Sequence, residues 1–202
     1  MSGDAFCAQG DVALRLMRAQ SSDYQLMAQW LTDERVLEFY EGRDNSFPLE
    51  RVIEKYSPRV LGAERVVPCF ILYRAQPIGY IQYYPVGEID LHEYGLPAQA
   101  HTFGIDLFIG EPEFWNRGIG TRALTLLVSF LFDQRSADLI VIDPETWNTR
   151  AIRSYEKCGF RKLKILPRHE LHEGEYRDSW LMAISRAEFT HERPTAQRLG
   201  GN

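Results

Sequence analysis

The sequence has few cysteines and no long apolar run, and both absences narrow the kind of protein it encodes. Its three cysteines, Cys7, Cys69 and Cys158, lie far apart and form no C-x-x-C pair. This argues against a disulfide framework and favours a reducing compartment. No apolar run approaches the ~20 residues that span a bilayer, and the first residues lack the basic and apolar regions of a signal peptide. We therefore expect a soluble, cytoplasmic protein.

Basic residues are also too few for a general nucleic-acid binder. The chain has 23 Lys and Arg against 28 Asp and Glu, which gives a formal charge of −5. Proteins that bind nucleic acids through their phosphates normally carry the opposite balance. A mildly acidic protein is better suited to a cationic small molecule. We expect such a partner, no nucleic acid or membrane partner, and a monomer or a homodimer.

What the sequence does contain is ordinary for a globular protein. Hydrophobic residues make up 45% and charged residues 25% of 202 residues, a length that fits one domain. The first residues are small and polar, and the last are poor in apolar side chains. We therefore place a single domain at residues 12–189, between a flexible leader at 1–11 and a flexible tail at 190–202.

Along this domain, the spacing of the hydrophobic residues alternates between that of helices and that of strands. Ser22 and Gln25 predict a capping box at the start of a helix, and Gly159 is placed to end another helix as a left-handed cap. Helices are also expected at 48–61, interrupted by Pro58, at 121–132 and at 148–158. Strands are expected at 12–17, 66–73, 78–86, 101–110, 138–143, 160–166 and 179–185. The 87–101 segment shows no period, and a connection this long is usually functional or mobile.

The most informative stretch is residues 105–124, where a strand leads through Gly118 and Gly120 into a helix. Glycines let backbone N–H groups approach a ligand, and the following helix start offers unpaired donors and a positive dipole end. Such a loop suits a phosphate or diphosphate. Spacing alone favours a plain β-to-α turn, because short glycine motifs are weak signals and neither the Walker nor the Rossmann pattern is present.

Two segments resemble the GNAT N-acetyltransferases. Residues 114–121, FWNRGIGT, resemble the acetyl-coenzyme A loop Q/R-x-x-G-x-G/A, with Trp115 departing from its first position. Residues 148–160, NTRAIRSYEKCGF, resemble the family helix N-x-x-A-I-x-x-Y-E-K-x-G-F. The resemblance implies an α/β fold of GNAT type: a mixed, mostly antiparallel sheet of about seven strands, flanked by helices, with a splayed acetyl-coenzyme A cleft. It also implies acetyl-coenzyme A as co-substrate and no metal.

A finer resemblance, to the aminoglycoside 6'-N-acetyltransferases, extends from about residue 14 to residue 189. It rests on residues 36–42, 77–82 and 104–106. It implies transfer of an acetyl group to the 6'-amino group of an aminoglycoside, and antibiotic resistance. The alternatives are a GNAT enzyme for another amine (a siderophore precursor, a polyamine or a protein N-terminus) and a catalytically silent acetyl-coenzyme A sensor.

Asp106 is the candidate general base. It is the one acid in an apolar strand and points away from the apolar face formed by Phe103 and Ile105. An amine must lose a proton before it attacks a thioester, and a carboxylate can accept that proton. An ordinary solvent-facing role is about as common for such a residue, and the resemblance favours catalysis. The resemblance also implies that Tyr155 protonates the departing thiolate, although its apolar helical neighbours equally suit a core tyrosine.

The resemblance further implies a set of residues that bind the co-substrate. The strand residues would pair with the pantetheine arm and the glycine loop would hold the diphosphate. Arg153 and Lys157 could reach phosphates, although exposed helix charges are more often solvated. The co-substrate set is Leu107, Phe108, Ile109, Trp115, Arg117, Gly118, Ile119, Gly120, Thr121, Asn148, Ala151, Tyr155 and Lys157.

The acceptor site is expected where acidic and aromatic residues gather in three loops. A polycationic sugar suits such a lining, and aromatic rings could stack on it, although loop carboxylates are usually solvated. We expect only two or three of the carboxylates to touch substrate. The acceptor set is Phe39, Tyr40, Glu41, Tyr80, Asp90, Glu93, Asp106, Asp143 and Glu145, with Asp44 and Glu88 nearby in sequence.

Two further features are set aside. His169 and His172 do not have the H-E-x-x-H spacing of a zinc protease, and we expect them in a polar turn between the closing strands. Cys158 has no histidine partner in its segment, so we expect a small buried residue and not a nucleophile.

Overall fold

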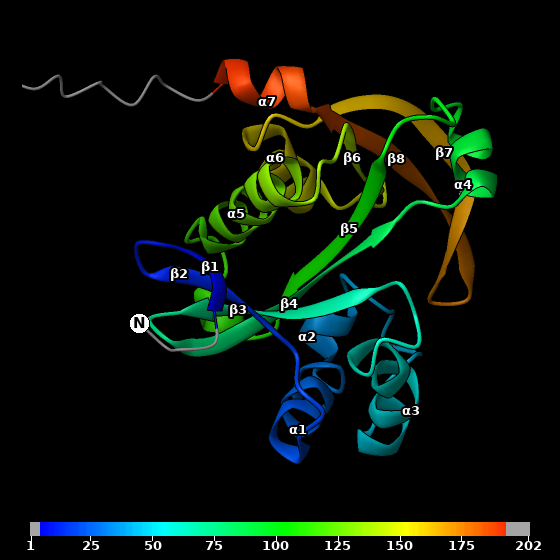
Figure 1. The fold of residues 1–202 in the computed structure, drawn as a ribbon. Coiled ribbons are helices and arrows are strands. Elements are labelled where there is room, and N and C mark those ends of the chain that lie inside the picture. The colour runs from blue at the N-terminus through cyan, green and yellow to red at the C-terminus, as the bar shows by residue number, and fades with distance from the viewer. Residues whose placement is uncertain (1–4, 193–202) are drawn as a thin grey trace, which may run out of the picture.

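The computed structural model describes residues 5–192. They form one eight-stranded sheet with the strand order β1-β2-β3-β4-β5-β6-β8-β7 (Figure 1). The strands are β1 (Ala5–Gln9), β2 (Val12–Leu16), β3 (Val67–Tyr73), β4 (Gln76–Pro85), β5 (Thr102–Ile109), β6 (Leu139–Ile142), β7 (Arg161–His172) and β8 (Glu175–Ser185). The helices are α1 (Ser21–Trp30), α2 (Glu34–Leu37), α3 (Leu49–Val60), α4 (Glu88–Tyr94), α5 (Ile119–Gln134), α6 (Thr149–Lys157) and α7 (Arg186–Glu192), with a 3₁₀ turn at Pro112–Phe114. The expected mixed, mostly antiparallel α/β sheet is confirmed, with one strand more than expected.

The sheet splays between β5 and β6. These strands pair in parallel only from Thr102 to Gly104, whereas every other neighbouring pair of described strands is antiparallel. β5 continues to Ile109 along β4, while the chain beyond β6 follows β8, where Glu145 bridges to Ser179. The edge of β5 from Ile105 onward is therefore left without a strand partner on the β6 side, and a cleft opens there.

The two faces of the sheet are covered by different helices. α5 and α6 lie on one face and α1, α2 and α3 on the other (Figure 1). Ile105 packs into the core beneath α5, whereas Phe108 packs with Tyr80 on the face covered by α1 and α3. Because side chains alternate along a strand, Asp106 lies on the Phe108 face, as the sequence pattern predicts.

Several local expectations are corrected. Residues 5–9 of the expected leader form β1, which pairs with β2, and α7 extends past residue 189; residues 1–4 and 193–202 of the leader and tail lie outside the described residues. α1 begins at Ser21 without a side-chain cap, so the capping box of Ser22 and Gln25 does not form. Instead, Arg15 and the backbone N–H of Arg18 hold the buried Asp23 in its first turn.

Two further corrections concern a proline and a loop. α3 continues through Pro58 to Val60, because a proline in the last turn removes few hydrogen bonds. Residues 88–94 of the expected irregular connection form α4, which ends at the left-handed Gly95. The expected left-handed conformation of Gly159 after α6 is confirmed, with a φ of +94°.

Candidate active site

A cleft of about 870 Å³ opens at the splay of β5 and β6. Its walls come from β5, the start of α5, α6, the segment after β6, the residues after α2, and α3. It brings together most of the predicted site residues: Asp106 and Tyr155; Leu107, Phe108, Ile109, Trp115, Gly118, Ile119, Gly120, Thr121, Asn148, Ala151 and Lys157; and Phe39, Tyr40, Glu41, Asp143 and Glu145. Segments more than 100 residues apart in the chain meet here because the strands diverge.

Four predicted residues do not line the cleft. Arg117 is exposed and its guanidinium lies over the Phe114 ring, 5.4 Å from the centroid. Tyr80 is fully buried in the core, and Asp90 and Glu93 are exposed on α4. The structure therefore gives these four residues no place at the surface of the cleft.

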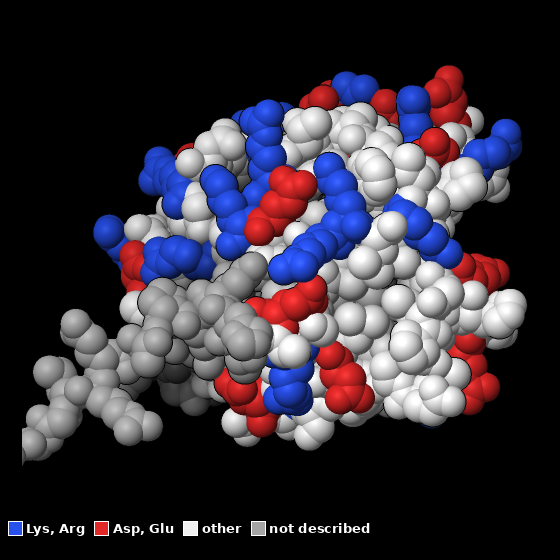
Figure 2. Space-filling view, turned by 90° about the horizontal axis from the view of Figure 1, so that it is seen from above, with Lys and Arg blue, Asp and Glu red and all other residues white. Residues whose placement is uncertain are grey.

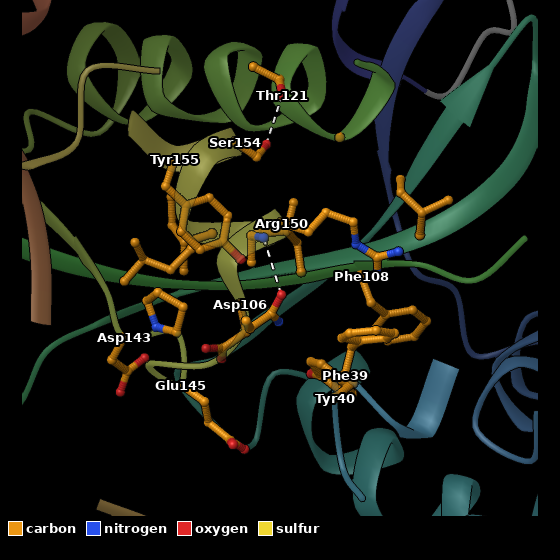
Figure 3. A pocket seen from close by; sticks show the side chains of 18 of the residues that line it. Phe39, Tyr40, Asp106, Phe108, Thr121, Asp143, Glu145, Arg150, Ser154 and Tyr155 are labelled. Carbon is orange, nitrogen blue, oxygen red and sulfur yellow. Dashed lines mark hydrogen bonds between the residues drawn. The ribbon is translucent and has the colours of Figure 1, made fainter. Parts of the chain in front are cut away.

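Asp106 lies at the centre of the cleft (Figure 3). Its Oδ2 accepts a hydrogen bond of 2.5 Å from Nε2 of Gln82, its cross-strand partner on β4. Burial and the neighbouring Asp143 carboxylate raise the pKa of Asp106 to about 7, against the lowering effect of the Gln82 hydrogen bond. A carboxyl group with this pKa can both accept and release a proton near neutral pH.

Tyr155 faces Asp106 across the cleft (Figure 3). Its ring is buried against the core beneath α5, and its hydroxyl makes no hydrogen bond within residues 5–192. Burial and the nearby Asp106 raise the pKa of Tyr155, so the hydroxyl keeps its proton at neutral pH. Tyr155 therefore belongs to the core and also lines the cleft, while its part in proton transfer stays a prediction.

The start of α5 forms one end of the cleft. Gly118 occupies the N-cap with a φ of +70°, and no side chain caps the helix. A Cβ at Gly118 would meet nothing within 4 Å, and a Cβ at Gly120 would meet only Ile109, at 3.7 Å. The packing of the protein therefore does not demand glycine at 120. No side chain among the described residues caps the backbone N–H groups of this first turn, and unpaired N–H groups at a helix start can bind an anion.

Charged and aromatic side chains surround this helix start. Arg153 and Lys157, one turn apart on α6, are exposed, line the cleft and form no ion pair among the described residues. Trp115 donates its indole N–H to the Ile109 carbonyl at 2.8 Å, so one carbonyl of the open β5 edge already has a partner. The Arg150 guanidinium packs against both the Phe39 and the Trp115 ring, 4.2 and 4.3 Å from their centroids. The basic side chains favour an anionic ligand at this end.

The carboxylates of the cleft differ in how far they are already engaged. Glu41 accepts from Lys55 at 2.6 Å and from Asn45 at 3.2 Å. Glu145 is buried, and its two oxygens meet the His172 ring at 2.8 Å and the Trp147 indole N–H. Both carboxylates therefore hold the protein together, and neither has an oxygen without a partner.

Asp143 and Glu170 are the acceptor-side carboxylates with free oxygens. Asp143 uses Oδ2 for a 2.9 Å contact with His169, and no described residue bonds its Oδ1. Glu170, which the sequence analysis missed, lines the cleft and keeps much of its side chain open to solvent. Partial desolvation and the Asp143 and Glu145 carboxylates raise the pKa of Glu170 to about 7. This wall suits a cationic ligand.

The histidines behind this wall correct another expectation. His169 and His172 lie on β7 and not in a turn, which Glu173 and Gly174 form instead. Each contacts a carboxylate of the cleft wall. Residues 5–192 contain no group of three or more His, Cys, Asp or Glu side chains arranged for a metal ion. Cys158 is buried, as expected, and contacts Thr121 and Thr125.

Two polar residues near Asp106 were not predicted from the sequence. Gln82 and Arg59 line the cleft and are hydrogen-bonded to each other at 3.0 Å. The available signal was one amide in the otherwise apolar run at 78–84. On the face shown in Figure 2, basic side chains gather over the upper left and centre with a few acidic ones among them, and most of the right side is uncharged. None of the described helices is both long and apolar enough to cross a membrane.

Comparisons with known proteins give a consistent picture. A family model described as an acetyltransferase (GNAT) domain matches residues 19–167. An aminoglycoside N(6')-acetyltransferase type 1 from Klebsiella pneumoniae is 34% identical over 152 residues, which are 75% of this chain and 74% of the relative. An N(6)-hydroxylysine O-acetyltransferase from Escherichia coli is 27% identical over 151 residues, 71% of this chain and 44% of that protein.

A solved structure supports the same fold. The crystal structure of an aminoglycoside acetyltransferase in complex with coenzyme A and kanamycin superposes with a TM-score of 0.71 and is 28% identical in sequence. The match covers 91% of this chain and 99% of that one. The splayed sheet and its flanking helices are thus shared along nearly the whole described chain.

Proposed function

The chain belongs to the GNAT acetyltransferase family, and from this we propose that it transfers an acetyl group from acetyl-coenzyme A to an amino group of a cationic small molecule. The observation that carries the proposal is the placement of Asp106 and Tyr155 on opposite sides of one cleft, beside the uncapped start of α5 (Figure 3). A proton acceptor, a proton donor and an anion site then border the same space.

The residues at the start of α5 fit the diphosphate of acetyl-coenzyme A. Free N–H groups from Ile119 onward and the positive end of the helix dipole would hold it, with Arg153 and Lys157 close by. The open space at Gly118 and Gly120 is what close approach of a ligand needs. When bound, acetyl-coenzyme A supplies the thioester that the amine attacks. The open edge of β5 would align its pantetheine arm.

Asp106 would prepare the amine. Alkylamines have pKa values near 10 and arrive protonated. The Asp106 carboxylate would bind the ammonium group, orient it and accept its proton, directly or through water, as the neutral amine attacks. Such a group contributes roughly 10²–10⁴-fold to the rate. Tyr155 would donate its proton to the departing thiolate. Transfer would be direct within a ternary complex, with no acyl-enzyme.

An aminoglycoside, acetylated at its 6'-amino group, is the acceptor that we propose. Relatives that carry this activity in their names match this chain at 34% identity, and a structural neighbour was solved with kanamycin. The free carboxylates Asp143 and Glu170 suit further ammonium groups of such a sugar, and Phe39 and Tyr40 offer rings to stack on it. Antibiotic resistance would follow from this activity.

A second candidate acceptor is a siderophore precursor such as N6-hydroxylysine, or a polyamine. The similarity to an N(6)-hydroxylysine O-acetyltransferase favours testing it. A catalytically silent sensor of acetyl-coenzyme A is the third reading, and the presence of both Asp106 and Tyr155 in the cleft argues against it.

The test is thiol release from acetyl-coenzyme A with different acceptors. Kanamycin, spermidine, N6-hydroxylysine and peptides with free N-termini are offered in turn at fixed pH. A matched pair of aminoglycosides, with an amino or a hydroxyl group at the 6' carbon, tests the position. We expect turnover with kanamycin and loss of turnover with the 6'-hydroxyl compound. If only another amine is turned over, that amine replaces the aminoglycoside as the proposed acceptor. If coenzyme A binds tightly and no acceptor is turned over, the protein is better explained as an acetyl-coenzyme A sensor.

A further inference from the structure

A chain of hydrogen bonds leads from α3 through β4 to Asp106. Gln82 donates from Nε2 to Asp106, and its Oε1 accepts from Arg59 Nη1 at 3.0 Å and from Tyr80 Oη at 2.7 Å. We propose that Gln82 is a positioning residue which, held by Arg59, aims its amide N–H at the Asp106 carboxylate and keeps that carboxylate ionised for proton acceptance. This inference rests on the proposed acetyl transfer and adds how its base is controlled.

The orientation of the Gln82 amide decides whether it donates a hydrogen bond to Asp106. An amide can present either its oxygen or its NH₂ group to a neighbour. An Arg guanidinium has donors only, so the oxygen of Gln82 must face Arg59 and the NH₂ group must face Asp106. The Tyr80 hydroxyl can donate or accept, so it supports either orientation. Arg59 is therefore the residue that fixes the direction, and Tyr80 is an accessory.

The surroundings hold this arrangement in place. Gln82 and Tyr80 are buried, and Gln82 lies directly opposite Asp106 in the antiparallel register of β4 and β5. Arg59 is held from the far side by Glu64 at 3.1 Å and lies over the Tyr56 ring, 5.3 Å from its centroid. A buried network with every member bonded is rigid, and losing one member leaves an unpaired polar group.

Burial and the neighbouring carboxylates favour the neutral form of Asp106, and Gln82 and Arg59 oppose them. Burial is the largest influence and favours the neutral acid. The titratable groups that interact electrostatically with Asp106 come from several elements: Tyr40 and Glu41 after α2, Tyr56 and Arg59 on α3, Tyr80 and Tyr84 on β4, Tyr94 on α4, Asp143 after β6, Tyr155 on α6 and Glu170 on β7. The carboxylates among them also oppose ionisation. Gln82 and Arg59 act in the opposite direction.

The decisive measurement is the titration of the Asp106 carboxyl carbon by NMR, which requires no turnover. The resonance is assigned by its absence from Asp106→Asn. Gln82→Met keeps the volume of the side chain and removes the donor, and Arg59→Met releases the amide. Tyr80→Phe removes the accessory donor. Tyr83→Phe is the matched control, because it removes a hydroxyl–Arg135 hydrogen bond from the opposite face of the same strand.

We expect Gln82→Met and Arg59→Met each to raise the pKa of Asp106 by about one. Gln82→Met removes the donor to the carboxylate, and Arg59→Met both releases the amide and removes a nearby positive charge. Tyr80→Phe should raise it less, Arg59→Lys should restore part of the loss, and Tyr83→Phe should leave it unchanged. The pH at which kcat/KM falls on the acidic side of its profile should rise by the same amount. At a pH below this point, kcat/KM should be roughly tenfold lower than in the wild type, and the acceptor KM should change less.

The outcomes separate the two proposals. An unchanged or lowered pKa of Asp106 in folded Gln82→Met would overturn the role of Gln82. If Gln82→Met does not fold, Gln82→Leu, which also lacks the donor, takes its place, because Arg59→Met removes a positive charge as well and does not isolate the amide. If the wild-type protein turns over no acceptor, the proposed function fails, while the titration still decides whether Gln82 controls Asp106.

Discussion

Replacing Asp106 by Asn should lower activity and, above neutral pH, raise the stability of the folded protein. Asp106 ionises at about pH 7 in the folded protein instead of near its ordinary value of 3.8. A carboxyl whose folded pKa is raised binds its proton more tightly in the folded state, so its contribution to stability is present below about pH 4 and is lost as pH rises through 7. The Asn side chain does not ionise, so the variant does not lose this stability as pH rises.

The magnitude follows from the shift. About three pKa units at 1.36 kcal/mol each give about 4 kcal/mol as the cost of ionisation above pH 7. Water in the open cleft screens part of this, so we expect a gain of about 1–3 kcal/mol for Asp106→Asn. In a domain of this size, 1 kcal/mol corresponds to about 2–4 °C in Tm. Asn can still accept the Gln82 hydrogen bond, so the local structure should persist.

The assay is thermal unfolding of both proteins from pH 5 to pH 8.5, with acetyl transfer measured on the same samples. The Tm difference should grow from pH 5 to pH 7 and then level off, while kcat/KM falls roughly 10²–10⁴-fold. Asp90→Asn, on exposed α4 and outside the cleft, is the control and should leave the pH dependence of Tm unchanged. A Tm difference that is constant with pH, or a less stable Asp106→Asn variant at pH 8, would refute the reasoning.

Three other substitutions test other parts of the cleft. Gly120→Ala should leave Tm nearly unchanged, because the new Cβ meets nothing closer than 3.7 Å, yet weaken coenzyme A binding as measured by calorimetry; unchanged affinity would contradict the diphosphate site. Tyr155→Phe should keep its buried ring and coenzyme A affinity but lower kcat roughly 10²-fold or more; an unchanged kcat would remove the hydroxyl from proton transfer. Asp143→Asn should raise KM for a cationic acceptor and lower the pKa of Asp106, because Asp143 raises that pKa; an acid limb that moves upward would contradict this charge assignment.

The carboxylates that line the cleft fall into two groups: those bonded to other residues of the protein and those with an oxygen that has no described partner. Glu145 joins the segment after β6 to His172 on β7 and to Trp147, and Glu41 joins the residues after α2 to Lys55 on α3. Both line the cleft, but their oxygens are already used within the protein. Among the described carboxylates that line the cleft, Asp106, Asp143 and Glu170 keep an oxygen without a partner in the protein. Of the loop carboxylates named from the sequence, Asp143 alone lines the cleft with an oxygen that has no described partner, and Glu170 was not among those named. How many of them touch an acceptor stays a prediction.

Local sequence determined the parts of the site that depend on short-range geometry. Alternation along residues 103–109 placed Ile105 in the core and Asp106 on the other face, because side chains of a strand alternate. Gly118 and Gly120 marked the helix start, and the helical spacing of Ala151, Ile152 and Tyr155 predicted the side of α6 that packs inward. These features follow from bonds and periods within one segment.

Tertiary structure alone decided which polar groups meet. The Gln82–Asp106 pair depends on the register of β4 against β5, and Arg59 reaches Gln82 from a helix 23 residues earlier. The placement of Tyr80 in the core, and of Glu170 in the cleft wall, likewise depends on how β4 and β7 pack against their neighbours. No local period encodes such contacts, because strand register and the divergence of β5 from β6 arise from packing across the whole sheet.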